Sequence, residues 1–428
     1  MEPEPPEGSE VTFERGAPSG IFASLRYRNL RLLWIGQTGH AAALWMEQIA
    51  RPWLVLVITD DNPAHLGGVV AVRVVPQLLF GVWAGVIADW FDRKTLLFGT
   101  KLGVFILNVA FATVLVSGQI ELWHIYAMSF TRGIFMAFDQ PARQSLIADS
   151  VPASLLTNAV ALMSSTQNFM RIAGVMASGL LLWLLGINGT FVTIAIVYLV
   201  TVVATKMIDV PAKSRPRGGA RAMRADLAEG FRFAWSSPPI RGVLALSLVF
   251  YGTAMMWMQL FAPLFARTVL NTGELGIATL VAVGGAGSLL GSLRLASTPS
   301  GTPGRRISLS VLIMGGFLMA FGAAPWMPEP FDLAATYAAI FGVGVFHGGY
   351  LPLSHTILLT AAPEHMRGRV ISLVSLDRAM TTAGAAGGGL LAAGIGAQST
   401  QLVFGALTLV GGLAVLLLAT GLRDYRMR

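Results

Sequence analysis

Cysteine is missing from this 428-residue sequence, and charged side chains are scarce. Without cysteine the chain can form no disulfide and can bind no metal through a thiolate. Asp, Glu, Lys and Arg make up only 12% of the residues, which is about half of the share that is usual in a soluble protein. Hydrophobic residues reach 54% and the mean hydropathy is +0.65. This composition excludes an ordinary soluble domain and indicates a protein that crosses a membrane several times.

The remaining polar residues exclude two further classes of protein. The net charge of +8 comes from basic residues spread over many short loops, so it does not indicate a nucleic-acid partner. No nucleophile–base pair or metal-ligand cluster recurs at a useful spacing, so we expect no enzyme, no cofactor and no metal site.

Twelve apolar runs are long enough to cross a bilayer, which takes about 20 residues. We therefore predict an all-α polytopic membrane protein of twelve transmembrane helices in two pseudo-symmetric six-helix lobes. The apolar runs fall near residues 30–58, 66–88, 96–117, 122–147, 156–184, 189–207, 240–266, 275–295, 307–326, 333–360, 369–394 and 401–422. The predicted domains are a disordered acidic tail, the N-terminal lobe, a cytoplasmic linker, the C-terminal lobe and a short C-terminal tail, at residues 1–28, 29–207, 208–239, 240–422 and 423–428.

The two halves repeat one another weakly. Residues 149–162 align with residues 360–373, which places Pro152 on Pro363 and Leu162 on Leu373. Related halves of this kind are typical of a two-lobed transporter with a central binding site.

Basic residues predict the orientation in the membrane. One side of this scheme collects 24 of the 30 lysines and arginines, whereas the other side has only Arg267. Cytoplasmic loops are rich in Lys and Arg, so both termini are predicted to be cytoplasmic. In the linker, Leu227, Phe231 and Trp235 recur every fourth residue, which indicates an amphipathic helix lying on the membrane surface.

Several motifs give the chain a family resemblance. Residues 85–94 read GVIADWFDRK and resemble the loop signature between helices 2 and 3 of the major facilitator superfamily. Five further segments resemble its bacterial efflux branch, which contains the enterobactin exporter and macrolide efflux proteins: residues 31–37, 45–46, 52–55, 138–144 and 366–372. Residues 171–179 resemble the antiporter signature of helix 5, although Val175 stands where that pattern has Pro.

The resemblance implies alternating access and proton-driven export, and it implies a gate on the cytoplasmic side. In the family pattern, the loop between helices 2 and 3 meets the start of helix 11, and its charges control this gate. Asp139 would join Arg93 in a charge relay, and Asp89 would lie near Arg378 or a helix N-terminus. The expected gating residues are Gly85, Asp89, Arg93, Lys94, Arg143 and Arg378.

Charged side chains inside the predicted spans are functional candidates, because a charge at bilayer depth is costly. His40, Glu47 and Arg51 lie on one face of the first helix. Glu47 and Arg51 are either a structural ion pair or a protonatable carboxylate with a modulating cation. Arg132 resembles the basic residue of helix 4 that the family links to proton coupling, and Asp377 completes the proton-coupling candidates Glu47, Arg51, Asp139, Arg132 and Asp377.

The sequence indicates a substrate-binding surface less clearly than it indicates the charged candidates. Helix 7 has an aromatic and methionine-rich region, which suits varied apolar ligands but is also typical of a lipid-facing stripe. Arg73, Arg132 and Arg171 have fold maintenance as an alternative role, and for His347 and His355 a packed neutral ring is favoured. The cavity candidates are His40, Arg171, Tyr251, Met255, Trp257, Met258 and His347.

Together these features predict a monomeric secondary transporter of the bacterial cytoplasmic (inner) membrane. Its partners would be protons, lipid and a bulky, largely apolar small molecule such as a drug, a macrolide or a siderophore. Two alternatives remain open, a lysophospholipid or lipid transporter and a non-transporting scaffold or sensor with the same fold.

Overall fold

A computed structural model describes residues 20–90, 92–209, 229, 231–297, 301–363, 366–367, 370 and 376–426. Within these ranges, the side chains of residues 81–90, 141, 145, 296 and 376 lie outside the description. The described residues form helices and loops and contain no strand.

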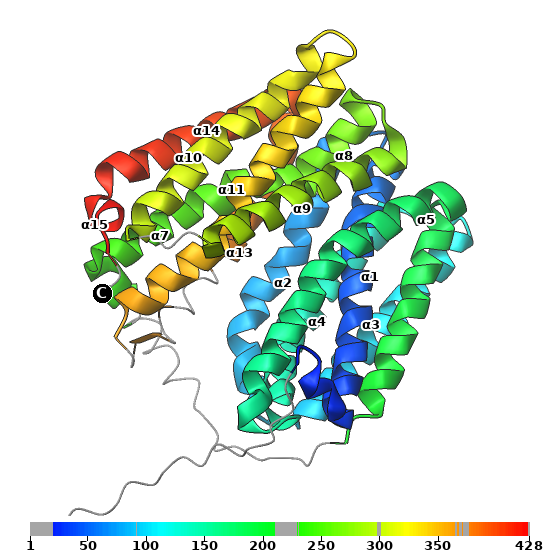
Figure 1. The fold of residues 1–428 in the computed structure, drawn as a ribbon. Helices are drawn as coiled ribbons and strands as arrows, with labels where there is room; N and C mark the ends of the chain where they lie inside the picture. The colour runs from blue at the N-terminus through cyan, green and yellow to red at the C-terminus, as the bar shows by residue number, and fades with distance from the viewer. Residues whose placement is uncertain are drawn as a thin grey trace, which may run out of the picture.

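The first half of the chain forms a bundle around α1 and α5. Its elements are η1 (Ala23–Arg26), α1 (Arg28–Ile58), α2 (Pro63–Trp90), α3 (Arg93–Val116), α4 (Leu122–Asp149), η2 (Ala153–Leu155) and α5 (Leu156–Lys206). The chain reverses direction inside α5 at Gly186, whose φ of 66° is left-handed and therefore suits glycine. Figure 1 shows the two arms of α5 on either side of this bend.

The second half forms a second bundle. It contains α7 (Pro238–Val249), α8 (Ala262–Leu264), α9 (Gly273–Ser297), α10 (Pro303–Ala323), η6 (Ala324–Trp326), α11 (Phe331–Ala361), α13 (Leu376–Ile395), α14 (Ala397–Leu418) and α15 (Thr420–Arg423). Between α7 and α9 the helix widens into three π-helical segments, η3 (Phe250–Ala254), η4 (Trp257–Phe261) and η5 (Phe265–Val269). Such widened turns are frequent at functional sites.

Nine helices of the described part are long and apolar enough to cross a membrane. One of them is the pair of arms that meets at Gly186. The 28-residue α4 and the 20-residue α13, both of which contain charged side chains, are not among the nine. The all-α polytopic class is therefore confirmed, while the count of twelve spans and the domain boundaries stay predictions.

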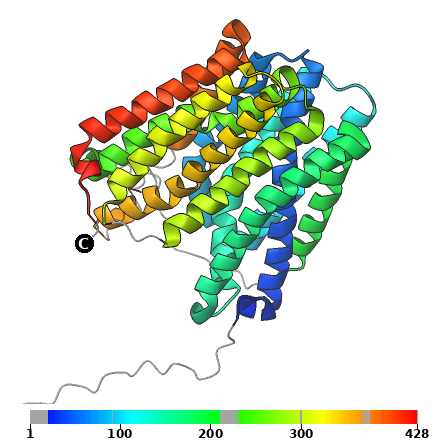
Figure 2. The ribbon, with the colours of Figure 1, turned by 45° about the horizontal axis from the view of Figure 1, so that its top comes forward.

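The two bundles are inclined to one another and are in contact at one end (Figures 1 and 2). We call the end at which Gly20 and Arg426 lie the terminal end, and the opposite end, with the turns at 59–62 and 270–272, the distal end. The main contacts between the bundles join α2 to α13 and α5 to α9. In both views the bundles meet near the distal end and diverge toward the terminal end.

Glycines allow the close contacts between the bundles. A Cβ atom added to Gly67 of α2 would clash with the carbonyl oxygen of Ala385 and would lie 2.8 Å from Cα of Gly389, both on α13. On the other side of the molecule, a Cβ atom at Gly179 of α5 would clash with the side chain of Ala278 on α9. Backbones can approach this closely only where side chains are small.

The described part of the predicted linker is residues 208–209, 229 and 231–239. Residues 231–236 are helical, and the rings of Phe231 and Trp235 stack with their centroids 6.0 Å apart. Both side chains are exposed, as a helix on a membrane surface requires. Leu227, the first residue of the predicted amphipathic stripe, lies outside the described residues.

Candidate functional site

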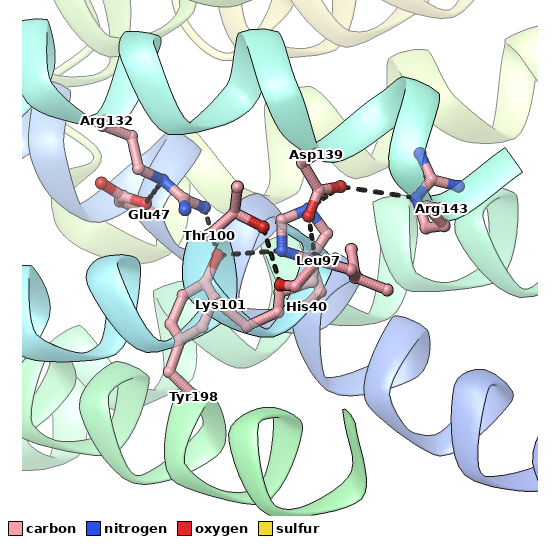
Figure 3. Close-up of polar contacts among 9 residues, drawn as sticks. All are labelled: His40, Glu47, Leu97, Thr100, Lys101, Arg132, Asp139, Arg143 and Tyr198. Carbon is pink, nitrogen blue, oxygen red and sulfur yellow. Dashed lines mark hydrogen bonds and ion pairs between the residues drawn. The ribbon is translucent and has the colours of Figure 1, made fainter. Parts of the chain in front are cut away.

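Glu47 is a buried carboxylate placed between two guanidinium groups. Its side chain is 1% exposed and forms an ion pair with Arg51, one turn further along α1. Its second oxygen, Oε2, lies 3.2 Å from Nε of Arg132, which comes from α4 and is itself 1% exposed (Figure 3). The sequence predicted the pair within α1, because residues four apart share a helix face. Each oxygen of Glu47 thus faces a different cation, and α1 is tied to α4.

Arg132 extends this cluster to the second arm of α5. It donates a hydrogen bond to the hydroxyl of Tyr198, and its guanidinium carbon lies 5.0 Å from the centre of the Tyr198 ring. The same hydroxyl lies 3.3 Å from Nδ1 of His40. His40 is therefore bonded within this chain of polar side chains and is not a cavity-lining residue with a free side chain (Figure 3).

Asp139 forms the other end of the chain. Nζ of Lys101 on α3 lies 2.5 Å from Oδ1, and Nε of Arg143 donates to Oδ2 over 3.4 Å. Nε2 of His40 lies 3.9 Å from the same Oδ2. Sequence reasoning missed Lys101, which is 2% exposed, because it was counted among the basic residues that set topology. Its place inside an apolar run was the signal that could have found it.

These residues form one network, which we call the N-lobe network. It contains Arg51, Glu47, Arg132, Tyr198, His40, Asp139, Lys101 and Arg143. Four basic side chains share two carboxylates. Each carboxylate therefore binds two cations. Removing its negative charge leaves these cations, which are buried or partly buried, without their partner, which is costly in a medium of low dielectric constant.

In this structure Arg93 is not paired with Asp139, so the relay between them stays a prediction. Arg93 begins α3 and forms an ion pair with Asp149, the last residue of α4. Asp139 lies ten residues earlier in α4, which is about 15 Å along the helix axis, and it is paired with Lys101 instead. Asp92 caps α3 by accepting a hydrogen bond of 2.9 Å from the backbone N–H of Thr95.

The other gating candidates are only partly described. Gly85 and Asp89 lie in the last turns of α2, where the side chains are outside the description, so the expected contact between Asp89 and Arg378 is untested. Lys94 is the second residue of α3 and is half-buried. Arg378 lies near the start of α13, and its Nη1 donates to the carbonyl oxygen of Gln77 on α2 over 3.5 Å. This bond joins the two bundles.

Asp377 faces the second bundle. It lies close enough to Tyr251 and Ser247 to interact with both. The Ser247 hydroxyl also lies 2.9 Å from that of Tyr350, which stacks on Phe250 with a centroid distance of 3.7 Å. Tyr251 is thus a partner of the candidate Asp377, a contact that the sequence did not predict.

A pocket of about 220 Å³ lies between the bundles. It is lined by Leu44, Trp45, Gln48, Arg73, Val74, Gln77, Met136, Gln259, Arg378 and Thr381. Arg73 of α2 spans it by donating to the side-chain oxygen of Gln48 and, over 2.9 Å, to that of Gln259 on η4.

The predicted cavity residues do not line this pocket. His40 belongs to the N-lobe network, and Trp257 is 3% exposed and packs against Gly284 of α9. Arg171 and His347 lie near each other between α5 and α11. Tyr251, Met255 and Met258 pack against the hydrophobic core. The pocket residues Gln48 and Gln259 were missed because isolated amides form no sequence pattern, whereas Arg73 was named only as a charged residue within a span.

The fold and these buried charges define a multi-pass membrane protein whose two helical bundles enclose a polar interior. Residues 19–427 match the transmembrane secretion effector family of the major facilitator superfamily, and the chain belongs to this family of transporters.

Three curated relatives are similar over most of their length. The staphyloferrin A transporter of Staphylococcus aureus is 26% identical over 79% of this chain and 83% of its own. The multidrug efflux pump Tap of Mycolicibacterium fortuitum is 27% identical over 86% and 90%. Macrolide efflux protein A of Streptococcus pyogenes is 26% identical over 81% and 86%.

A solved structure has the same fold. The inward-facing, unoccupied bacterial homologue of the human lysosomal transporter Spinster superposes with a TM-score of 0.71 at 16% identity, and it covers 95% of this chain and 99% of its own.

Proposed function

We propose that the protein is a proton-coupled antiporter that exports a bulky, largely apolar small molecule from the bacterial cytoplasm. Membership of the family and the names of its relatives, which include a multidrug pump and a macrolide efflux protein, support export. The observation that supports proton coupling is the position of Glu47 between Arg51 and Arg132.

Protonation of Glu47 changes the energy of both of its contacts. The ionised carboxylate holds Arg51 and Arg132 in place inside the bundle. The neutral acid no longer attracts either cation, so each guanidinium must find another partner or water. Because Arg51 lies on α1 and Arg132 on α4, the protonation state of Glu47 biases how these two helices pack.

The rest of the N-lobe network transmits this change toward the terminal end. Arg132 is linked through Tyr198 to His40, and His40 lies beside Asp139. Asp139 is seven residues beyond Arg132 in α4, which is about 10 Å nearer the terminal end. We propose that this chain couples proton binding at Glu47 to the packing of α3 and α4 near the terminal end.

The arrangement of the bundles supports alternating access. At the distal end, Arg267 of η5 forms an ion pair with Asp61, and its guanidinium lies 4.9 Å from the centre of the Trp53 ring. These contacts join the two bundles and would break when the distal end opens. If the terminal end is cytoplasmic, as the basic residues predict, this structure is an inward-facing state.

The test is a substrate screen in everted membrane vesicles. Respiration acidifies the vesicles, and a quenched pH-sensitive dye reports proton efflux when a compound is exchanged for protons. We expect dye recovery with at least one drug, macrolide or siderophore, the same recovery with the exposed control variant Glu329→Gln, and none with vesicles that lack the protein. A complete absence of recovery, with the protein present in the membrane, would favour the scaffold or sensor alternative.

A further inference from the structure

The pocket between the bundles contains two arginines that come from opposite sides. Arg73 lies on α2 of the first bundle, and Arg378 lies on α13 of the second. Trp45, Leu44 and Met136 contribute apolar surface to the same pocket. A molecule that enters between the bundles therefore meets two guanidinium groups beside an apolar wall.

The hydrogen bonds of these two arginines with described residues are to neutral groups. Arg73 donates to the amide oxygens of Gln48 and Gln259, and Arg378 donates to the backbone carbonyl oxygen of Gln77. None of the ion pairs between residues that the structure describes includes Arg73 or Arg378.

Asp377 is the acid nearest to Arg378 in the chain, and it attracts the Arg378 charge. Asp377 also interacts with Tyr251 and Ser247 of the second bundle. It is not among the residues that line the pocket.

The surroundings increase the positive charge of the pocket. Arg51 and Arg132 of the N-lobe network are close enough to Arg73 for the charges to repel. That network itself has four basic side chains for two carboxylates. A cation entering the pocket would be repelled, whereas an anion would gain two guanidinium partners in a water-poor interior.

We propose that the pocket binds an anionic oxygen group of the transported molecule between Arg73 and Arg378, with the apolar part of that molecule against Trp45 and Met136. Guanidinium groups bind carboxylates and phosphates through paired, charge-assisted hydrogen bonds. This inference rests on the proposed export function and narrows its substrate class to amphipathic organic anions.

A pair of dyes of opposite charge tests the wild-type protein directly. Fluorescein and rhodamine 6G share a xanthene ring system, but at pH 8 the first is an anion and the second a cation. Binding to the purified full-length protein in neutral detergent is measured by fluorescence anisotropy, with protein-free micelles as the blank. We expect fluorescein to bind at least about tenfold more tightly, because it gains charge-assisted bonds that the cation lacks. Equal or tighter binding of rhodamine 6G would overturn the proposal.

Three variants locate the anion. Arg73→Gln and Arg378→Gln should each weaken fluorescein binding by about 10- to 100-fold, which is the effect of losing one charged hydrogen-bond donor. Arg241→Gln, which removes an exposed arginine of α7 outside the pocket, should leave binding unchanged. Size-exclusion elution and thermal unfolding establish that each variant is folded. If Arg73→Gln does not fold, Arg378→Gln and the two dyes still decide the question. Unchanged fluorescein binding in folded Arg378→Gln would refute the site.

Competition distinguishes the two sources of anionic oxygen. Dodecanoate offers a carboxylate, and lysophosphatidylglycerol offers a lipid phosphate. Displacement of bound fluorescein by dodecanoate alone assigns a carboxylate substrate, and displacement by the lysolipid alone assigns a lipid. Failure of both to displace it would overturn the proposal. If fluorescein does not bind but the vesicles exchange protons for a cationic drug, the anion site is wrong and the antiporter is retained.

Discussion

Replacing Glu47 with glutamine should separate proton coupling from simple ion pairing. The amide is nearly the same size as the acid, so packing within α1 is preserved. However, the amide has no charge in any state and cannot gain or lose a proton. We expect Glu47→Gln to retain substrate binding but to lose accumulation of substrate against its gradient.

The stability cost follows from the burial of the three side chains. Glu47, Arg51 and Arg132 are 1%, 4% and 1% exposed. Breaking one buried ion pair by removing a partner costs about 3–5 kcal/mol. Glu47→Gln leaves two cations without their partner, so its free energy of unfolding should fall by at least that amount. The matched surface change Glu329→Gln should alter it by less than about 0.5 kcal/mol.

Two further variants give the assay its controls. Glu47→Asp keeps a titratable carboxylate and should keep part of the coupled transport. In Glu47→Gln with Arg51→Leu, one of the two stranded cations is gone. About half of the lost stability should then return, whereas coupled transport should not.

Thermal unfolding and pH-gradient-driven uptake in everted vesicles are measured for each variant. Full coupled transport by the double variant would refute the role of Glu47 and would leave Asp139 or Asp377 as the next candidate.

Three other perturbations follow from the described contacts. Lys101→Met should lower thermal stability, because it leaves a buried carboxylate with one fewer cation; an unchanged unfolding temperature would mean that this lysine does not contribute. In the double variant Asp61→Cys with Arg267→Cys, a short bifunctional thiol reagent should cross-link the two cysteines and stop transport. The reagent should not stop transport in either single variant, since the native chain has no cysteine to react. Continued transport after cross-linking would contradict opening at the distal end. Arg93→Ala and Asp149→Asn should slow transport to a similar extent, by shifting the balance of states by about 1–3 kcal/mol, and dissimilar effects at equal expression would show that the two do not act as a pair.

Sequence reasoning named six of the eight residues of the N-lobe network and missed Tyr198 and Lys101. His40, Glu47 and Arg51 were assigned to one face of a helix because residues seven and eleven apart must lie there in any α-helix. Tyr198 is more than 150 positions from His40, and no local rule brings them together. Lys101 was missed for a different reason, since the positive-inside rule explains most basic residues of such a chain without placing any of them in the interior.

The membrane fold was predictable because long apolar runs are the strongest signal that a sequence contains. The pocket was not, because its lining residues come from α1, α2, α4, α13 and η4, which only tertiary packing brings together. The relay from Arg93 to Asp139 was transferred from a family pattern and stays a prediction, because Arg93 is paired with Asp149 in this structure.

The most direct measurement is proton release from the purified protein when substrate binds. The protein is placed in weakly buffered detergent solution with a pH indicator, and a compound found in the vesicle screen is added. Our account predicts release of protons by the wild type and by the control Glu329→Gln, and none by Glu47→Gln at a substrate concentration that saturates it. Equal release by Glu47→Gln and the wild type, or no release by the wild type, would contradict proton-coupled antiport through Glu47.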